Sequence, residues 1–306
     1  MAKSARPWYG RDLGLSVRMM ITMLLLAALY AGFVAVLWAV HVPWGLLIVI
    51  MALVALSQYA LSDQIVLWSA GARILRPQEA PELHRIITRL AQIADLPTPK
   101  LAWINTRMPN AFTIGKNPKN AVVAVTQGLV DRLDENELEA VLAHELTHIK
   151  NRDVTVITLA SFFAMVASFI VQQFFFFGFG MENDRRDRQG GGVSAVMVVW
   201  LASIIVWAVS YVLIRTLSRY REYAADRGSA ILTGHPGYLA SALLKIQSGM
   251  RMAPTRDLRQ AEAFNAFFIF PAMRKDSLME LFATHPTIEH RIRRLESLQQ
   301  QMEKKP

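Results

Sequence analysis

The hydrophobic residues of the chain gather in four long blocks that contain no charged side chain. The blocks cover residues 19–40, 42–61, 154–179 and 193–214. A helix of 22 residues, the length of the first block, is about 33 Å long, and the hydrocarbon core of a bilayer is about 30 Å thick. Helices buried in soluble proteins rarely stay uncharged over this length, so we predict four transmembrane helices in two hairpins, 19–61 and 154–214. The first block is too long for a cleaved signal peptide, and we interpret it as an anchor.

The segments outside these blocks, 62–153 and 215–306, resemble parts of a soluble domain. In segment 62–153, the pattern predicts helices at 79–94 and 134–150. Between them it predicts three short strands, at 100–104, 110–115 and 121–126. The stretch 110–115 ends in a Gly/Asn/Pro turn, which is compatible with an edge strand. The second segment reads as helical. We therefore expect a mainly α membrane protein in which 62–153 and 215–306 form one α+β domain with a small sheet.

Positive charge marks one side of the membrane. Lysine and arginine occur in residues 1–18, after the second block, before the third and after the fourth, but not at the connection between the first two. The positive-inside rule places both termini and 62–153 in the cytoplasm. The loop 182–188 disagrees mildly, because it carries three arginines yet has to lie outside. The net charge of +9 is thus explained mostly by membrane flanks, and nucleic-acid binding is a poor second interpretation.

Composition excludes further classes of protein. Apolar residues make up 53% of the chain and charged residues 19%, which excludes an intrinsically disordered protein. The chain has no cysteine, so disulfides, thiolate metal sites and cysteine nucleophiles are excluded as well. The apolar blocks contain no acidic or basic residue, so nothing in them indicates a transport path.

One short motif carries chemistry. Residues 144–148 read HELTH, on the helix predicted for 134–150. Histidines four residues apart lie on one face of a helix, so His144 and His148 can bind one zinc ion, and Glu145 can reach a water on that ion. Helical geometry places Glu145 within the apolar stripe of its helix, where a carboxylate is costly without a partner. A metal-bound water is such a partner.

A third metal ligand is expected elsewhere in the chain. Metzincins have a glycine and a histidine where this chain has Asn151 and Val154, which excludes that class. Glu222 and Asp226 lie four residues apart just after the last apolar block. One of them can bind the metal while the other steadies a histidine. The plainer interpretation is an acid pair that compensates neighbouring arginines.

At these residues the chain resembles the HtpX-type membrane zinc metalloproteases, relatives of the CAAX prenyl endopeptidases and of the gluzincins. The motifs that carry the resemblance are NAFTIG, AVVAVTQGLVDRL, VLAHELTHIKNRD, SRYREYAADRGSA and LFATHPTIEHRI. The resemblance implies a zincin-like catalytic domain with one zinc ion bound by His144, His148 and Glu222, and with Glu145 catalytic. It also implies a stress-related quality-control enzyme of the inner membrane, whose cytoplasmic active site degrades misfolded or damaged membrane proteins.

The chain departs from this family at two places. Such proteins usually have a second proline after His285-Pro286, whereas this chain has Thr287. In thermolysin-like relatives a polar residue before the ligand glutamate can support the second histidine. Arg221 stands at that place here and cannot accept a hydrogen bond, so the partner of His148 stays open.

The remaining roles are hypotheses. We expect Asp226 to hold His144 through its free ring N–H. Residues Asn110, Ala111 and Phe112 resemble the edge strand on which related proteases bind an extended peptide. His285 is the candidate oxyanion donor because Pro286 holds it in an extended conformation, and Arg291 and Tyr223 are weaker candidates.

Two rival interpretations stay open at this stage. The HELTH helix could lie inside the membrane, although its polar neighbours argue against that. The chain could also be a catalytically inactive polytopic scaffold or a transport accessory protein. On the favoured interpretation its partners are unfolded polypeptides and the lipid bilayer, with no nucleic acid.

Overall fold

The computed structural model describes residues 12–41, a few positions between 45 and 56, and residues 67–115, 117–177, 195–251 and 286–304. The chain divides into two compact units. One unit comprises Met1–Ser16, Asp63–Val156 and Ser218–Pro306, and the other comprises Val17–Ser62 and Ile157–Leu217.

Three helices of the described part are long and apolar enough to cross a membrane. They are α1 (Leu13–Ala39), α6 (Asp153–Phe177) and α7 (Ala195–Thr233). Tyr30 of α1 donates a hydrogen bond to the carbonyl oxygen of Ala160 in α6, at 2.5 Å, and its ring centroid lies 4.8 Å from that of Phe163. The predicted second span, 42–61, lies largely outside the described residues.

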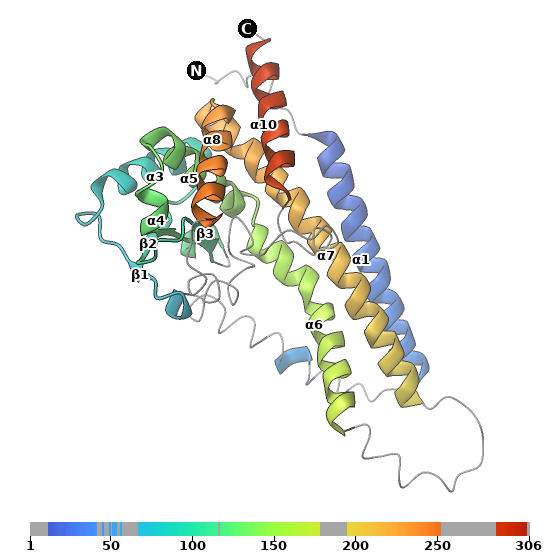
Figure 1. The fold of residues 1–306 in the computed structure, drawn as a ribbon. Helices are drawn as coiled ribbons and strands as arrows, with labels where there is room; N and C mark the ends of the chain where they lie inside the picture. The colour runs from blue at the N-terminus through green and yellow to red at the C-terminus, as the bar shows by residue number, and fades with distance from the viewer. Residues whose placement is uncertain are drawn as a thin grey trace, which may run out of the picture. The chain divides into compact units, whose positions relative to one another are not determined.

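Helix α7 extends well beyond the last apolar block. The last apolar block ends at residue 214, but α7 continues as one helix of 39 residues to Thr233 (Figure 1). Its continuation, 215–233, contains no proline and is rich in good helix formers such as alanine and arginine. The same unbroken helix therefore carries an apolar stretch and Glu222.

A four-stranded sheet lies in the first unit. The strand order is β1-β2-β4-β3, with β2 and β4 parallel and the other two pairs antiparallel. The strands are β1 (Arg73–Ile74), β2 (Lys100–Ile104), β3 (Ala111–Ile114) and β4 (Val122–Thr126). The three predicted strands are confirmed, with β3 at an edge, whereas β1 was not predicted.

Helix α5 (Glu135–Lys150) lies on one face of the sheet. Helices α3 (Pro81–Ala94) and α8 (Pro236–Arg251) pack against α5, and α10 (Ile288–Glu303) packs against α8. The short connections are α4 (Gln127–Val130) and a 3-10 helix (Pro118–Asn120). Leu101, Val123 and Val125 of the sheet share a buried core with apolar side chains of these helices. The opposite face has its own buried cluster around Phe112 and Ala124.

Helix α5 begins with the capping box that the sequence predicts. The Asp134 carboxylate accepts from the backbone N–H of Glu137, and the Glu137 carboxylate accepts from the backbone N–H of Asp134. Glu137 is buried, and it also accepts from the Ser241 hydroxyl and from Lys245, each at 2.6 Å. One carboxylate therefore both caps α5 and ties it to α8.

Candidate metal centre

Helix α5 presents two imidazoles to one point. His144 and His148 lie one helical turn apart, with their ring centroids separated by 4.7 Å and their planes nearly perpendicular at 88°. Their Nε2 atoms are 3.1 Å apart. Each ring therefore directs the same nitrogen toward a shared position.

Glu222 of α7 completes a set of three donors. Its two carboxylate oxygens lie 3.6 Å from Nε2 of His144 and 3.6 Å from Nε2 of His148. Ligand atoms in a tetrahedral site with bonds of about 2.0–2.1 Å are separated by about 3.4 Å. The three side chains thus have the spacing of a tetrahedral metal site, and their nitrogen and oxygen donors suit a divalent transition metal.

Each histidine uses its other nitrogen to contact a buried carboxylate. Nδ1 of His144 lies 3.1 Å from Oδ1 of Asp226, and Nδ1 of His148 lies 2.6 Å from Oδ2 of Asp153. The His148 contact is a hydrogen bond, and such a bond holds the proton on Nδ1 and leaves Nε2 as the donor to a metal, whereas His144 lies at ion-pair distance from Asp226. The predicted contact between Asp226 and His144 is present, and the partner of His148, which the sequence leaves open, is Asp153.

Arg221 contacts Asp153 rather than a histidine. Its Nη2 lies 2.8 Å from Oδ1 of Asp153, and its Nη1 donates to the backbone carbonyl of the same residue. Asp153 comes directly after a turn in which Arg152 has a left-handed φ of 54°, so it lies outside the helix that carries HELTH. Helical spacing alone could not place it beside His148. The sequence signal, in hindsight, was an acid immediately after the histidine helix.

Arg291 of α10 binds the carboxylates that surround the site. It is fully buried, and its Nε and Nη2 donate to the two oxygens of Asp226, at 2.9 and 2.6 Å. Its Nη1 lies 3.4 Å from Oε2 of Glu222. Arg291 therefore neutralises part of the negative charge of the site, and two of its three guanidinium nitrogens are bound to Asp226.

The two histidines differ in proton affinity. Burial alone would lower the pKa of His144, but the carboxylates of Asp226 and Glu222 raise it to about 9. Burial, together with the positive charge of His144, lowers the pKa of His148 to about 4. A metal requires both imidazoles in the neutral form. Metal binding at neutral pH therefore displaces a proton from His144.

Glu145 is held beside the edge strand of the sheet. Its side chain is buried, and Oε2 accepts a hydrogen bond of 2.8 Å from the Thr113 hydroxyl. Thr113 belongs to β3, so this hydrogen bond links the strand to the HELTH helix. No local pattern predicts this role of Thr113, because the contact joins residues 32 positions apart.

The first side chains of the edge strand β3 point into the interior, and part of its backbone faces away from the sheet. The side chains of Asn110, Ala111 and Phe112 are all buried. Asn110 pairs with Thr126 through a backbone hydrogen bond of 3.0 Å, and in an antiparallel pair the next residues alternate in direction. The N–H and C=O groups of Ala111 and Thr113 therefore point away from β4.

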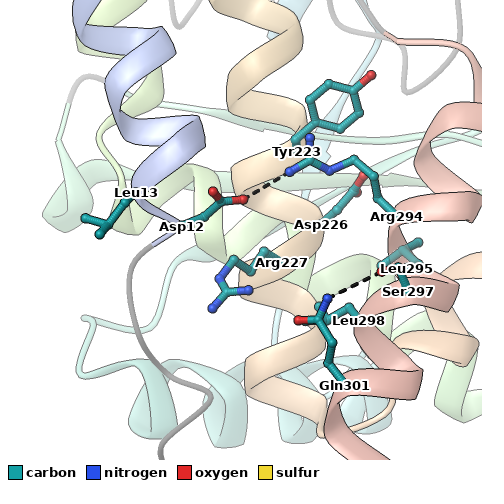
Figure 2. Close-up of a pocket in the computed structure, with 10 residues that line it drawn as sticks. All are labelled: Asp12, Leu13, Tyr223, Asp226, Arg227, Arg294, Leu295, Ser297, Leu298 and Gln301. Carbon is teal, nitrogen blue, oxygen red and sulfur yellow. Dashed lines mark hydrogen bonds and ion pairs between the residues drawn. The ribbon is translucent and has the colours of Figure 1, made fainter.

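The other two oxyanion candidates are His285 and Tyr223. His285 is outside the described residues. The ring of Tyr223 lies under the guanidinium of Arg294, with 4.4 Å between the carbon of that group and the ring centroid. Both residues line a hollow of about 620 Å³, whose wall includes Asp12 and Asp226 but none of the three candidate metal ligands (Figure 2).

Small residues let α7 approach α5 closely. A Cβ atom added to Gly228 would lie 2.3 Å from Cγ2 and 2.4 Å from Oγ1 of Thr147, in the HELTH motif. The neighbouring Ser229 hydroxyl donates to the carbonyl oxygen of Ala140, at 2.6 Å. This contact fixes the distance between the helix with Glu222 and the helix with the two histidines.

Comparison with known proteins identifies the family. Residues 77–299 match the model of Peptidase family M48. The chain belongs to this family. It is 61% identical to a protein named Protease HtpX homolog from Moorella thermoacetica, over 97% of this chain and 98% of that protein. It is 52% identical to Protease HtpX homolog 2 from Methanosarcina acetivorans, over 97% of this chain and 99% of that one.

A solved structure shares the fold of this M48 peptidase. The crystal structure of Ste24p from S. mikatae superposes with a TM-score of 0.54 at 19% identity, covering 93% of this chain and 67% of that one. The HtpX-type resemblance predicted from the motifs is confirmed, and the chain is a membrane-bound metalloendopeptidase that acts on polypeptides.

The close contact at Gly228 predicts a sensitive position in this M48 peptidase. Gly228→Ala should lower kcat/KM about 100-fold, because relief of the contact has to displace α7, which carries Glu222, from α5. Peptide hydrolysis by the purified variant measures the effect. Gly237→Ala in α8 is the matched control, since a Cβ there meets nothing within 4 Å. Equal loss in both variants would contradict a specific role for the contact.

Proposed function

We propose that this chain is a zinc-dependent endopeptidase of a bacterial-type inner membrane, with one zinc ion per chain. Its proposed substrates are misfolded or damaged membrane proteins, cleaved on the cytoplasmic side. The observation that carries the proposal is the convergence of Nε2 of His144, Nε2 of His148 and the carboxylate of Glu222. Two imidazoles and one glutamate, with a fourth position for water, are a common ligand set of catalytic zinc.

The residues around this set have distinct proposed roles. His144, His148 and Glu222 hold the zinc, and Asp226 orients His144. When bound, zinc supplies a Lewis acid that polarises the scissile carbonyl and makes water a stronger acid. Glu145 takes a proton from the attacking water and delivers it to the leaving amine. The hydrogen bond from Thr113 to Oε2 supports this role, because it keeps the carboxylate on the side of the edge strand.

The edge strand suggests how a substrate is held. A peptide that pairs with β3 would use the outward N–H and C=O groups of Ala111 and Thr113, next to Glu145. Backbone pairing tolerates varied side chains, which suits an enzyme that removes damaged proteins of many sequences. The neighbouring Asn110 and Phe112 belong to the proposed substrate-binding strand, and their buried side chains hold it in place. His285 is the proposed oxyanion donor, because Pro286 holds the residue before it in an extended conformation.

The proposed topology follows the charge pattern of the flanks. Residues 1–18, 62–153 and 215–306 lie in the cytoplasm, and the last two form the catalytic domain. The hairpins 19–61 and 154–214 supply four transmembrane helices. The lipid bilayer is therefore a partner of the enzyme, and unfolded polypeptide is its substrate.

One reconstitution tests the substrate class. The purified chain, loaded with zinc in vesicles, should cleave a polytopic membrane protein destabilised by a single substitution and spare the stable parent protein. Removal of the metal with a chelator should abolish cleavage, and one equivalent of zinc should restore it. Undiminished cleavage by the metal-free chain would refute the proposal. Failure of the zinc-loaded chain to cleave would favour the inactive scaffold.

Labelling tests the sidedness separately. The chain has no native cysteine, so single cysteines can be introduced without further changes. Glu139→Cys, on α5, should react with an impermeant maleimide only from the cytoplasmic face of inverted vesicles. Asn183→Cys, in the loop 182–188, should react only from the opposite face. The reverse pattern would overturn the cytoplasmic assignment.

A further inference from the structure

The two histidines of the candidate site are supported in the same way. Behind each imidazole stands a buried aspartate, and behind each aspartate stands a buried arginine. The two series are His144–Asp226–Arg291 and His148–Asp153–Arg221. The first arginine also contacts Glu222, whereas the second contacts both the side chain and the backbone carbonyl of Asp153.

The burial of Arg221 needs an explanation. Its side chain is 5% exposed, and a buried guanidinium is costly unless it is paired. Asp153, with its side chain 6% exposed, is its ion-pair partner. Two nitrogens of the planar group engage the side chain and the backbone carbonyl of Asp153, so the carboxylate has one defined orientation.

This orientation decides what His148 can do. With Oδ1 of Asp153 held by Arg221, Oδ2 is the oxygen that faces Nδ1 of His148, at 2.6 Å. The contact in turn aims Nε2 at Nε2 of His144 and at Glu222. A change at Arg221 is therefore transmitted to the candidate metal position through two contacts, although Arg221 itself touches no ligand nitrogen.

We propose that Arg221 is a positioning residue for His148, acting through Asp153. The proposal rests on the proposed zinc site. Arg221 directly precedes Glu222 on α7, so one helical turn supplies a ligand and also sets the orientation of a histidine on another helix. Without Arg221, the buried carboxylate of Asp153 loses its cation partner and its fixed rotamer. The imidazole of His148 is then no longer held in the geometry that zinc requires.

A double-mutant cycle on zinc affinity tests the proposal. We expect Arg221→Met and Asp153→Ala each to weaken zinc binding about 10- to 100-fold, the usual cost of losing support behind a metal-bound histidine. The double variant should be no weaker than Asp153→Ala alone, because Arg221 acts only through Asp153. Arg221→Lys should recover part of the loss, since it restores the charge but not the planar pair of donors. Competition with a chelating dye measures the dissociation constants of the full-length chain.

Controls separate this role from a purely structural one. Arg89→Met removes an arginine whose ion pair with Glu139 is exposed on α3 and α5, and it should leave zinc affinity unchanged. Thermal unfolding of each metal-free variant shows whether it is folded. A folded Arg221→Met chain with wild-type zinc affinity would overturn the proposal, and so would losses that multiply in the double variant. Absence of zinc binding in the wild-type chain would instead refute the proposed function.

Discussion

Replacement of Glu145 by glutamine is expected to lower kcat for peptide hydrolysis about 10³- to 10⁴-fold while the chain keeps its zinc. Glutamine preserves the shape of the side chain and can still accept from Thr113, at the position where the carboxylate accepts at 2.8 Å. It cannot take a proton from water at neutral pH. The chemical step should therefore fail, although folding, substrate pairing and metal content remain.

The experiment compares turnover with metal content in the same preparation. Glu139→Gln, which lies on the same helix in an ion pair with Arg89, is the matched control and should retain wild-type turnover. Metal analysis should find one zinc ion per chain in both variants, as in the wild type. If Glu145→Gln cleaves substrate at the wild-type rate, Glu145 is not the general base.

Loss of Glu222 should have a different signature. Glu222→Ala is expected to reduce zinc affinity more than 100-fold, because it removes a ligand, whereas loss of a supporting group costs about 10- to 100-fold. It also leaves Nη1 of Arg291 without the carboxylate that lies 3.4 Å away. Hydrolysis should fall in proportion to the bound zinc and should recover at high zinc concentration. We expect no such recovery for Glu145→Gln.

Zinc titration of the variant measures this effect. Glu289→Ala on α10 serves as the control, because it removes an exposed glutamate outside the site. Wild-type zinc affinity in Glu222→Ala would show that the third ligand is another residue.

Features set by local spacing were predictable from the sequence. The capping box at Asp134 depends on two residues three positions apart, and the pair His144 and His148 depends on one helical turn. The edge position of β3 followed from its flanking turn. Apolar blocks of sufficient length predicted α1, α6 and α7, because the thickness of a bilayer sets the length of a helix that spans it.

Features that depend on tertiary contacts were not predictable. Asp153 supports His148 only because a left-handed turn at Arg152 brings it back to the imidazole. A larger residue at position 228 would collide with Thr147 of another helix, and only the packing of the two helices shows this. Arg291 is far from Asp226 in the sequence, so no local pattern showed that it binds a carboxylate rather than a substrate.

The uninterrupted course of α7 has a consequence for regulation by lipids. A helix of 39 residues is about 58 Å long, and Glu222 lies on the same rod as an apolar stretch that has to match the acyl chains around it. Bilayers of different thickness change the tilt of such a helix. We therefore expect the tilt of α7, and with it the direction in which α7 presents Glu222, to depend on the length of the surrounding acyl chains.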